Sequence, residues 1–315
     1  MYAIYDKNYD IQEINRRIRT DPVEFVASCD ERMQQRIDRL AQRIADGLAE
    51  THCPIILVAG PSASGKTTMA QKLDASLEAL GLATQVLSLD NYYQTLDPDT
   101  CPRTPEGKID LESPLCLDLP LLAEHLAALS RGDEVLIPYF DFPTQRRDMS
   151  RAVPLRLGPN ELAIFEGIHA LNDSVVRLWP AAAKLYLSPH ADFWDGKDCF
   201  DHVWLRLMRR TVRDANFRNT SAADTLVLWN NVRRGERLYI DPFKSCANLH
   251  LNTTISYELN ALKDYALPLF RIVQKPTEVV REICRMLERV ESLHDRFIPP
   301  ESLVREFIGG GIYEY

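Results

Sequence analysis

A glycine-rich stretch at residues 60–68 carries the clearest chemical signal in this chain of 315 residues. It fits G-x-x-x-x-G-K-[ST], a loop whose backbone N–H groups wrap the phosphates of a nucleotide. In this pattern the lysine reaches the β- and γ-phosphates, the hydroxyl holds Mg²⁺, and the glycines allow an approach that a Cβ would block. The residues predicted to bind the nucleotide are Gly60, Ser62, Ala63, Ser64, Gly65, Lys66, Thr67 and Thr68.

The surroundings of the loop argue against a chance match in a turn rich in glycine and serine. Five apolar residues, 55–59, lead directly into it, as expected of a buried strand. Behind it Met69, Leu73, Leu77 and Leu80 recur at helical spacing, and Gly81 stands where a helix would stop. A strand, a tight loop and a helix are therefore predicted, and with them a nucleoside triphosphate site.

Two acids end two further apolar segments, Asp90 after residues 84–89 and Glu166 after residues 161–165. Ligands of open parallel sheets lie beyond the carboxyl ends of the strands, so both acids are expected near the loop. We predict that Asp90 is a general base that accepts the proton of an attacking hydroxyl, and that Glu166 is a ligand of Mg²⁺ or its waters together with Thr67. For Asp90, a helix-capping role and water-mediated Mg²⁺ binding stay open as alternatives.

Residues 203–214 form a predicted helix that concentrates arginine in an otherwise acidic chain. Its apolar stripe consists of Trp204, Leu205, Met208 and Val212, and its polar side carries Arg206, Arg209, Arg210 and Arg213. One interpretation is a solvated basic face. We favour a mobile lid, near residues 195–240, that brings guanidinium groups over the transferring phosphoryl group with the help of Arg218.

The remaining pattern predicts a three-layer α/β fold with a mainly parallel sheet of about five strands flanked by helices. Strands are expected at 134–142, 183–188 and 248–252, and helices at 32–50, 119–130, 229–238 and 255–266. Residues 190–201 are expected to be irregular, residues 275–293 to form a helix packed on the sheet, and the glycines 309–311 to form a turn. We expect an N-terminal helical extension at 1–50, a P-loop domain at 51–274 and a C-terminal helix and tail at 275–315 that pack on it.

The bulk properties limit the partners and the compartment. A net charge of −8 argues against a nucleic-acid partner. The seven cysteines are odd in number and widely spaced, which indicates reduced thiols rather than a disulfide framework or a zinc site. Neither a signal peptide nor a membrane-spanning run is present in the sequence given. We expect a cytoplasmic protein, with homo-oligomerisation left open.

Several motifs, in order, resemble the uridine kinase branch of the phosphoribulokinase/uridine kinase family. The resemblance covers about residues 54–270 and rests on five segments: 60–68, Asp90–Tyr93, Phe140–Phe142, Phe165–Ile168 and Arg209–Asp214. The segments 232–236 and 303–310 are similar to a bacterial nucleoside kinase subgroup. The family resemblance implies transfer of the γ-phosphoryl group of ATP to a 5′-hydroxyl of a nucleoside, most readily uridine or cytidine, with Mg²⁺ as cofactor.

The resemblance also implies roles for individual residues. Lys66, Asp90 and Arg213 are expected to be catalytic, and Asp141 to hold the ribose hydroxyls. The expected substrate-binding residues are Asp90, Tyr92, Phe140, Asp141, Gln145, Arg210, Arg213 and Arg218.

This chain departs from the family pattern in three places. Phe140 replaces the usual tyrosine, Gln145 stands where a histidine reads the pyrimidine, and Thr220 stands where a second lid arginine is common. Two alternatives to a nucleoside kinase therefore remain: a kinase of the same family acting on a sugar phosphate or another small alcohol, and a regulator that binds nucleotide without transfer.

Overall fold

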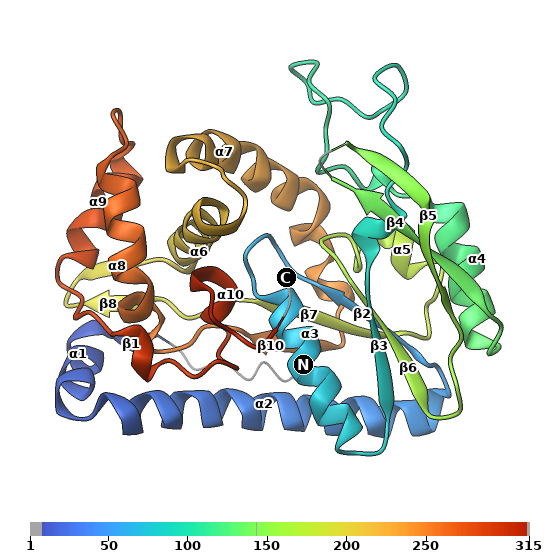
Figure 1. Ribbon diagram of the computed structural model, residues 1–315, viewed down its shortest axis with the longest axis horizontal. Helices are drawn as coiled ribbons and strands as arrows, with labels where there is room; N and C mark the ends of the chain where they lie inside the picture. The colour runs from blue at the N-terminus through green and yellow to red at the C-terminus, as the bar shows by residue number, and fades with distance from the viewer. Residues whose placement is uncertain (1–7, 143, 314–315) are drawn as a thin grey trace.

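A five-stranded parallel sheet forms the centre of the computed structural model, which describes residues 8–142 and 144–313 (Figure 1). The strand order is β10 (Leu249–Asn252), β7 (Ala183–Ser188), β2 (Ile55–Ala59), β6 (Glu161–Glu166) and β3 (Ala83–Ser88). The predicted fold class is confirmed. The central strand β2 runs directly into the glycine-rich loop, so the loop starts from the most constrained part of the sheet.

Alternate residues of β2 point to opposite faces of the sheet and enter two different cores. Ile56 and Val58 pack with α2 (Pro22–Thr51) and α3 (Lys66–Glu78) on one face. Ile55 and Leu57 pack on the other face with α4 (Leu119–Ser130) and residues of the hairpin β4 (Val135–Asp141) and β5 (Arg146–Leu155). Because both faces are covered, β2 is an unbroken apolar run, as buried parallel strands are.

The long helix α2 lies along the base of the molecule beneath α3 (Figure 1). Asp21 caps it by accepting a hydrogen bond from the Glu24 N–H, and Pro22 stands in its first turn, so the helix begins ten residues before the predicted range 32–50. It is preceded by β1 (Tyr9–Asp10) and α1 (Ile11–Thr20). In the first third of α2, Asp30 accepts a hydrogen bond from the hydroxyl of Tyr257, which also bonds Ser302 near the C-terminus.

The second half of the chain consists mainly of helices. It contains α5 (Asp173–Val176), α6 (His202–Phe217), α7 (Ala222–Tyr239), α8 (Glu258–Arg271), α9 (Glu278–Leu287) and α10 (Arg305–Ile308). Short 3₁₀ turns lie at η1 (Leu89–Tyr92), η2 (Pro114–Cys116), η3 (Asp241–Cys246) and η4 (Asp295–Phe297). None of the helices in the described part of the chain combines the length and apolarity that a membrane crossing requires.

Four expectations about local structure need correction. Residues 190–201 include a short hairpin, β8 (Phe193–Asp195) with β9 (Asp198–Phe200), which pairs with the distant β1. Helix α7 starts seven residues earlier than predicted, after the Ser221 cap. Helix α8 continues past Pro268 to Arg271, so the proline does not end the helix although it removes one backbone hydrogen bond from it. Helix α9 is shorter than predicted and packs on α8 and β9, not on the main sheet.

We predict that Ile37→Ala in α2 lowers the free energy of unfolding by about 2–5 kcal/mol, because the side chain is fully buried and its removal leaves a cavity. Chemical denaturation with a tryptophan-fluorescence readout measures the change. The control is Gln42→Ala, an exposed position of the same helix, which should change stability by less than about 0.5 kcal/mol. Equal, small effects of both variants would show that α2 is not part of the cooperative core.

Candidate active site

Gly60 begins the loop at a place where no side chain fits. A Cβ built on it would lie 2.1 Å from the carbonyl oxygen of Leu187, a backbone atom of the neighbouring strand. At the other end Gly65 has φ of 85° and forms the N-cap of α3. Both glycines predicted for the motif are thus required by geometry, one by contact and the other by backbone angle.

Side-chain donors on the side away from the cavity hold the loop by binding its backbone carbonyl groups. Arg206 donates to the Ser62 carbonyl (3.0 Å), Arg209 to the Ala63 carbonyl (3.1 Å), and the Thr253 hydroxyl to the Ser64 carbonyl (2.7 Å). The C=O and N–H of a trans peptide point in opposite directions. The N–H groups of Ala63 and Gly65 consequently point away from these donors, toward the cavity that the loop lines.

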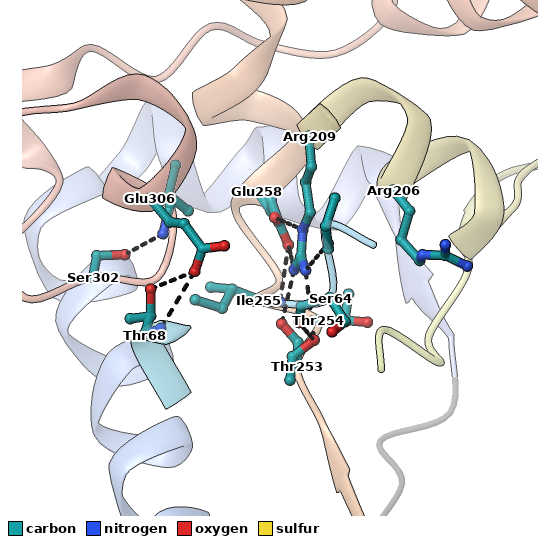
Figure 2. A network of polar contacts seen from close by, with 12 residues as sticks. Ser64, Thr68, Arg206, Arg209, Thr253, Thr254, Ile255, Glu258, Ser302 and Glu306 are labelled. Atoms are coloured by element: carbon teal, nitrogen blue, oxygen red, sulfur yellow. Dashed lines mark hydrogen bonds and ion pairs between the residues drawn. The ribbon is translucent and has the colours of Figure 1, made fainter. Parts of the chain in front are cut away.

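Buried carboxylates hold the two arginines in place, as Figure 2 shows for Arg209. Arg209 is fully buried and forms a bidentate pair with Glu258, at 2.5 and 2.7 Å. Arg206 is buried and pairs with Glu236 of α7. The prediction that these two arginines lie on the polar side of α6 and act in a lid is wrong; they clamp the loop.

A cavity of about 180 Å³ opens in front of the loop, and we call it the loop cavity. Its lining brings together the loop, both predicted acids and two of the predicted arginines. The lining residues are Ser62, Ala63, Ser64, Gly65, Lys66, Thr67, Asp90, Glu166, Gly167, Ile168, Arg213, Arg218 and Glu306.

Three charged side chains in the loop cavity are partly buried and shift one another's pKa. Burial lowers the pKa of the Lys66 ammonium, while Glu166, Asp90 and Glu306 oppose that shift. Burial raises the pKa of Asp90, against Lys66 and Arg218, and raises the pKa of Glu166 to about 7. Carboxylate and hydroxyl oxygens of this kind fit a hard divalent cation, so Glu166 and Thr67 are suitable residues to hold Mg²⁺.

A second cavity of about 220 Å³ adjoins the first, and we call it the aromatic cavity. Its lining includes three aromatic rings, and the residues are Asp90, Tyr93, Leu96, Leu111, Glu112, Cys116, Phe140, Phe142, Gln145, Ile168, Arg210 and Arg218. Asp90, Ile168 and Arg218 line both cavities. A molecule in the aromatic cavity would therefore meet a group in the loop cavity at Asp90.

Two predicted substrate-binding residues do not line either cavity. Tyr92 is fully buried, and its hydroxyl lies 2.9 Å from His125 Nδ1 in the core. The adjacent Tyr93 faces the aromatic cavity instead, because the 3₁₀ turn η1 points consecutive side chains in different directions. The Asp141 carboxylate accepts hydrogen bonds from the N–H and hydroxyl of Thr144 within the hairpin turn.

The three arginines predicted to bind phosphate gather around one acid. Asp214, buried in α6, pairs with Arg210 (3.2 Å) and Arg213 (2.8 Å), and Arg218 lies 3.8 Å from it. Arg210 also donates to the Ser62 hydroxyl (2.8 Å). Asp214 thus orients the guanidinium groups toward the two cavities.

Sequence reasoning missed Glu112 and Glu306 as lining residues. Burial raises the pKa of Glu112 to about 7, although Arg210 acts against this shift. Glu112 lies in the irregular stretch 94–118, where neither periodicity nor a motif marks it. Its packing against α7 needs Gly235, since a Cβ there would lie 2.5 Å from the Glu112 Cβ.

The chain is similar to kinases in its sequence. The profile of the Phosphoribulokinase / Uridine kinase family matches residues 55–256. Uridine kinases of Staphylococcus haemolyticus (strain JCSC1435) and Staphylococcus aureus (strain JH9) are each 30% identical over 196 residues, which is 62% of this chain and 85% of the relative. A solved D-glycerate 3-kinase from Cryptococcus neoformans covers 89% of this chain and 90% of its own, with 17% identity and a TM-score of 0.34.

We predict that Gly60→Ala abolishes measurable nucleotide binding, because the new methyl group must displace either β7 or the loop. Isothermal titration with ATP measures the binding, and circular dichroism checks the fold. Gly47→Ala in α2 is the matched control: nothing lies within 4 Å of a Cβ there, and alanine favours a helix by about 1 kcal/mol. Normal ATP affinity in the Gly60 variant would contradict the contact described above.

Proposed function

The chain belongs to the phosphoribulokinase/uridine kinase family, and we propose that it transfers the γ-phosphoryl group of ATP to the 5′-hydroxyl of a nucleoside, uridine or cytidine. One observation carries the proposal: Asp90 lies where the loop cavity meets the aromatic cavity. A hydroxyl entering from the aromatic side would lie next to a carboxylate and in front of the phosphate-binding loop.

The proposed reaction needs positioning and electrostatic stabilisation more than covalent chemistry. Asp90 accepts the proton of the acceptor hydroxyl as its oxygen attacks the γ-phosphorus and the bond to the leaving oxygen of ADP breaks. Lys66, Arg213 and Arg218 face the developing charge on the phosphoryl oxygens. Mg²⁺, held by Thr67 and Glu166, supplies further charge neutralisation when bound.

The aromatic cavity supports a flat, neutral acceptor. Tyr93, Phe140 and Phe142 contact one another edge to face, with ring centroids 5.2–6.2 Å apart, and offer apolar surface to a base. Gln145 lies at the same cavity and has both a donor and an acceptor for the edge of a base.

We also propose a second class of acceptor, because Gln145 stands at the position where the family resemblance leads us to expect a histidine that reads the pyrimidine. Another small alcohol without a base would also reach Asp90. We further propose that residues 51–274 are the kinase domain, that residues 1–50 and 275–315 support it, and that the enzyme acts in the cytoplasm.

A panel of acceptors tests the proposal. Purified protein with ATP and Mg²⁺ is incubated with uridine, cytidine, purine nucleosides, sugar phosphates and small alcohols, and ADP formation is measured. We expect the highest kcat/KM with uridine or cytidine. Preference for a simple alcohol would support the second class, and ATP binding without any transfer would indicate a regulator and contradict the proposal.

We predict that Asp90→Asn lowers kcat by about 10²–10⁴-fold with ATP affinity nearly unchanged, because an amide cannot accept the hydroxyl proton but keeps the volume of the side chain. Steady-state kinetics and ATP titration separate the two effects. Asp97→Asn, at an exposed position outside both cavities, is the control. Wild-type turnover in the Asp90 variant would exclude this residue as the base.

The pH dependence of kcat follows from the raised pKa of Asp90. The base works only when ionised, so kcat falls as the pH drops through its folded-state pKa. Because burial raises that pKa above the ordinary value of 3.8, the acidic limb should lie at a higher pH than for an exposed aspartate. Turnover that stays constant down to a pH of about 4 would contradict a buried carboxylate base.

A further inference from the structure

The C-terminal segment 302–311 lies against the phosphate-binding loop although it follows the family-matched range 55–256. Helix α10 lies between α6 and the start of α3 (Figure 1). Leu303, Val304 and Phe307 are fully buried. The side chain of Leu303 packs on Gly65, where an added Cβ would lie 2.5 Å from Leu303 Cδ1. The segment is thus a wall of the site rather than a loose tail.

Several polar contacts fasten the segment to the rest of the protein. Arg305 donates to the carbonyls of Asp295 (2.8 Å), Ile298 (2.6 Å) and Gly309 (3.1 Å). The Asn216 amide of α6 donates to the Phe307 carbonyl (3.0 Å). With its backbone held this firmly, the segment places the Glu306 side chain reproducibly.

Glu306 directs its carboxylate at the first turn of α3 (Figure 2). Its Oε2 accepts the Thr68 hydroxyl at 2.5 Å and lies 3.4 Å from the Thr68 N–H. The residue is only 7% exposed and also lines the loop cavity. The carboxylate of Glu306 therefore occupies hydrogen-bond donors of the first turn of α3, where the loop motif is expected to bind phosphate.

The first-turn N–H groups of a helix have no carbonyl partner within it and attract anions. A carboxylate is an anion and satisfies one of these donors without a ligand. The lining of the loop cavity otherwise has Lys66, Arg213 and Arg218 as cations and Asp90 and Glu166 as acids. The Glu306 carboxylate adds a third acid to this lining, so it weakens the attraction of the cavity for a triphosphate.

We propose that Glu306 is a built-in anion that competes with the phosphates of the nucleotide for the first turn of α3 and so sets the affinity for ATP. The proposal rests on the proposed function insofar as the loop binds ATP. The competition involves the Glu306 side chain alone, which turns away from Thr68 as the nucleotide enters, while the backbone of the segment stays in place.

Direct titration tests this role. ATP, inorganic triphosphate and adenosine are each titrated into the full chain by calorimetry, with EDTA present so that no divalent cation bridges the acids. Glu306→Gln keeps an oxygen for the Thr68 hydroxyl but removes the charge. We expect ATP and triphosphate to bind about fivefold to tenfold more tightly, the order of the interaction between two unit charges about 3–4 Å apart at the dielectric constant of water, with adenosine unchanged.

Two further variants make the result specific. Glu301→Gln removes a charge at an exposed position of the same region and should leave all three affinities unchanged. Glu306→Asp keeps the charge but shortens the side chain, so its ATP affinity should fall between those of the wild type and Glu306→Gln. If Glu306→Gln does not fold, tighter ATP binding by Glu306→Asp remains the decisive result.

Other outcomes would overturn the inference. Unchanged or weaker ATP binding in both Glu306 variants would show that Glu306 only anchors the segment. An equal gain for adenosine would show that the gain does not concern the phosphates. A wild-type protein that binds no ATP would instead contradict the proposed function, so the two failures are distinguishable.

Discussion

The contacts behind the glycine-rich loop are the constraint on which the site depends. A loop binds phosphate only if its N–H groups converge, and in isolation its peptide planes would rotate freely. Here Arg206, Arg209 and Thr253 hold successive carbonyls from outside, which turns the N–H groups of Ala63 and Gly65 inward, whereas the Ser64 N–H bonds the Pro61 carbonyl. The Arg209 guanidinium satisfies Glu258, Ala63 and Thr253 at once, so its burial leaves little hydrogen-bonding capacity unused.

This arrangement divides the arginines of one helix between two tasks. Residues 206 and 209 of α6 face the protein interior and shape the loop. Arg210 and Arg213 lie on the adjacent side of the same helix and pair with Asp214. Arg210 lines the aromatic cavity and Arg213 lines the loop cavity. Shape and charge are thus supplied by neighbouring turns of one rigid element, and a shift of α6 would change both together.

Local sequence patterns predicted what local interactions determine. The loop, its flanking strand and helix, and the order of the acid-ended strands all depend on residues close together in the chain, and the structure has them. The burial of Arg206 and Arg209 depends on acids 30 and 49 residues away, which helical periodicity does not register. Glu306 bonds Thr68, which lies 238 residues earlier in the chain. The turn η1 directs Tyr92 into the core and leaves Tyr93 at the aromatic cavity. Such features follow from tertiary packing.

The hydroxyl of Tyr257 joins two regions that lie outside the family-matched range, because it bonds Asp30 in α2 and Ser302 ahead of α10. Ser302 in turn accepts the Val304 N–H at the start of the segment that carries Glu306. Truncating either end of the chain would remove one of the two partners of the buried Tyr257 hydroxyl. The two terminal regions are therefore coupled through this hydroxyl, and a change at Asp30 would be transmitted to the segment that carries Glu306.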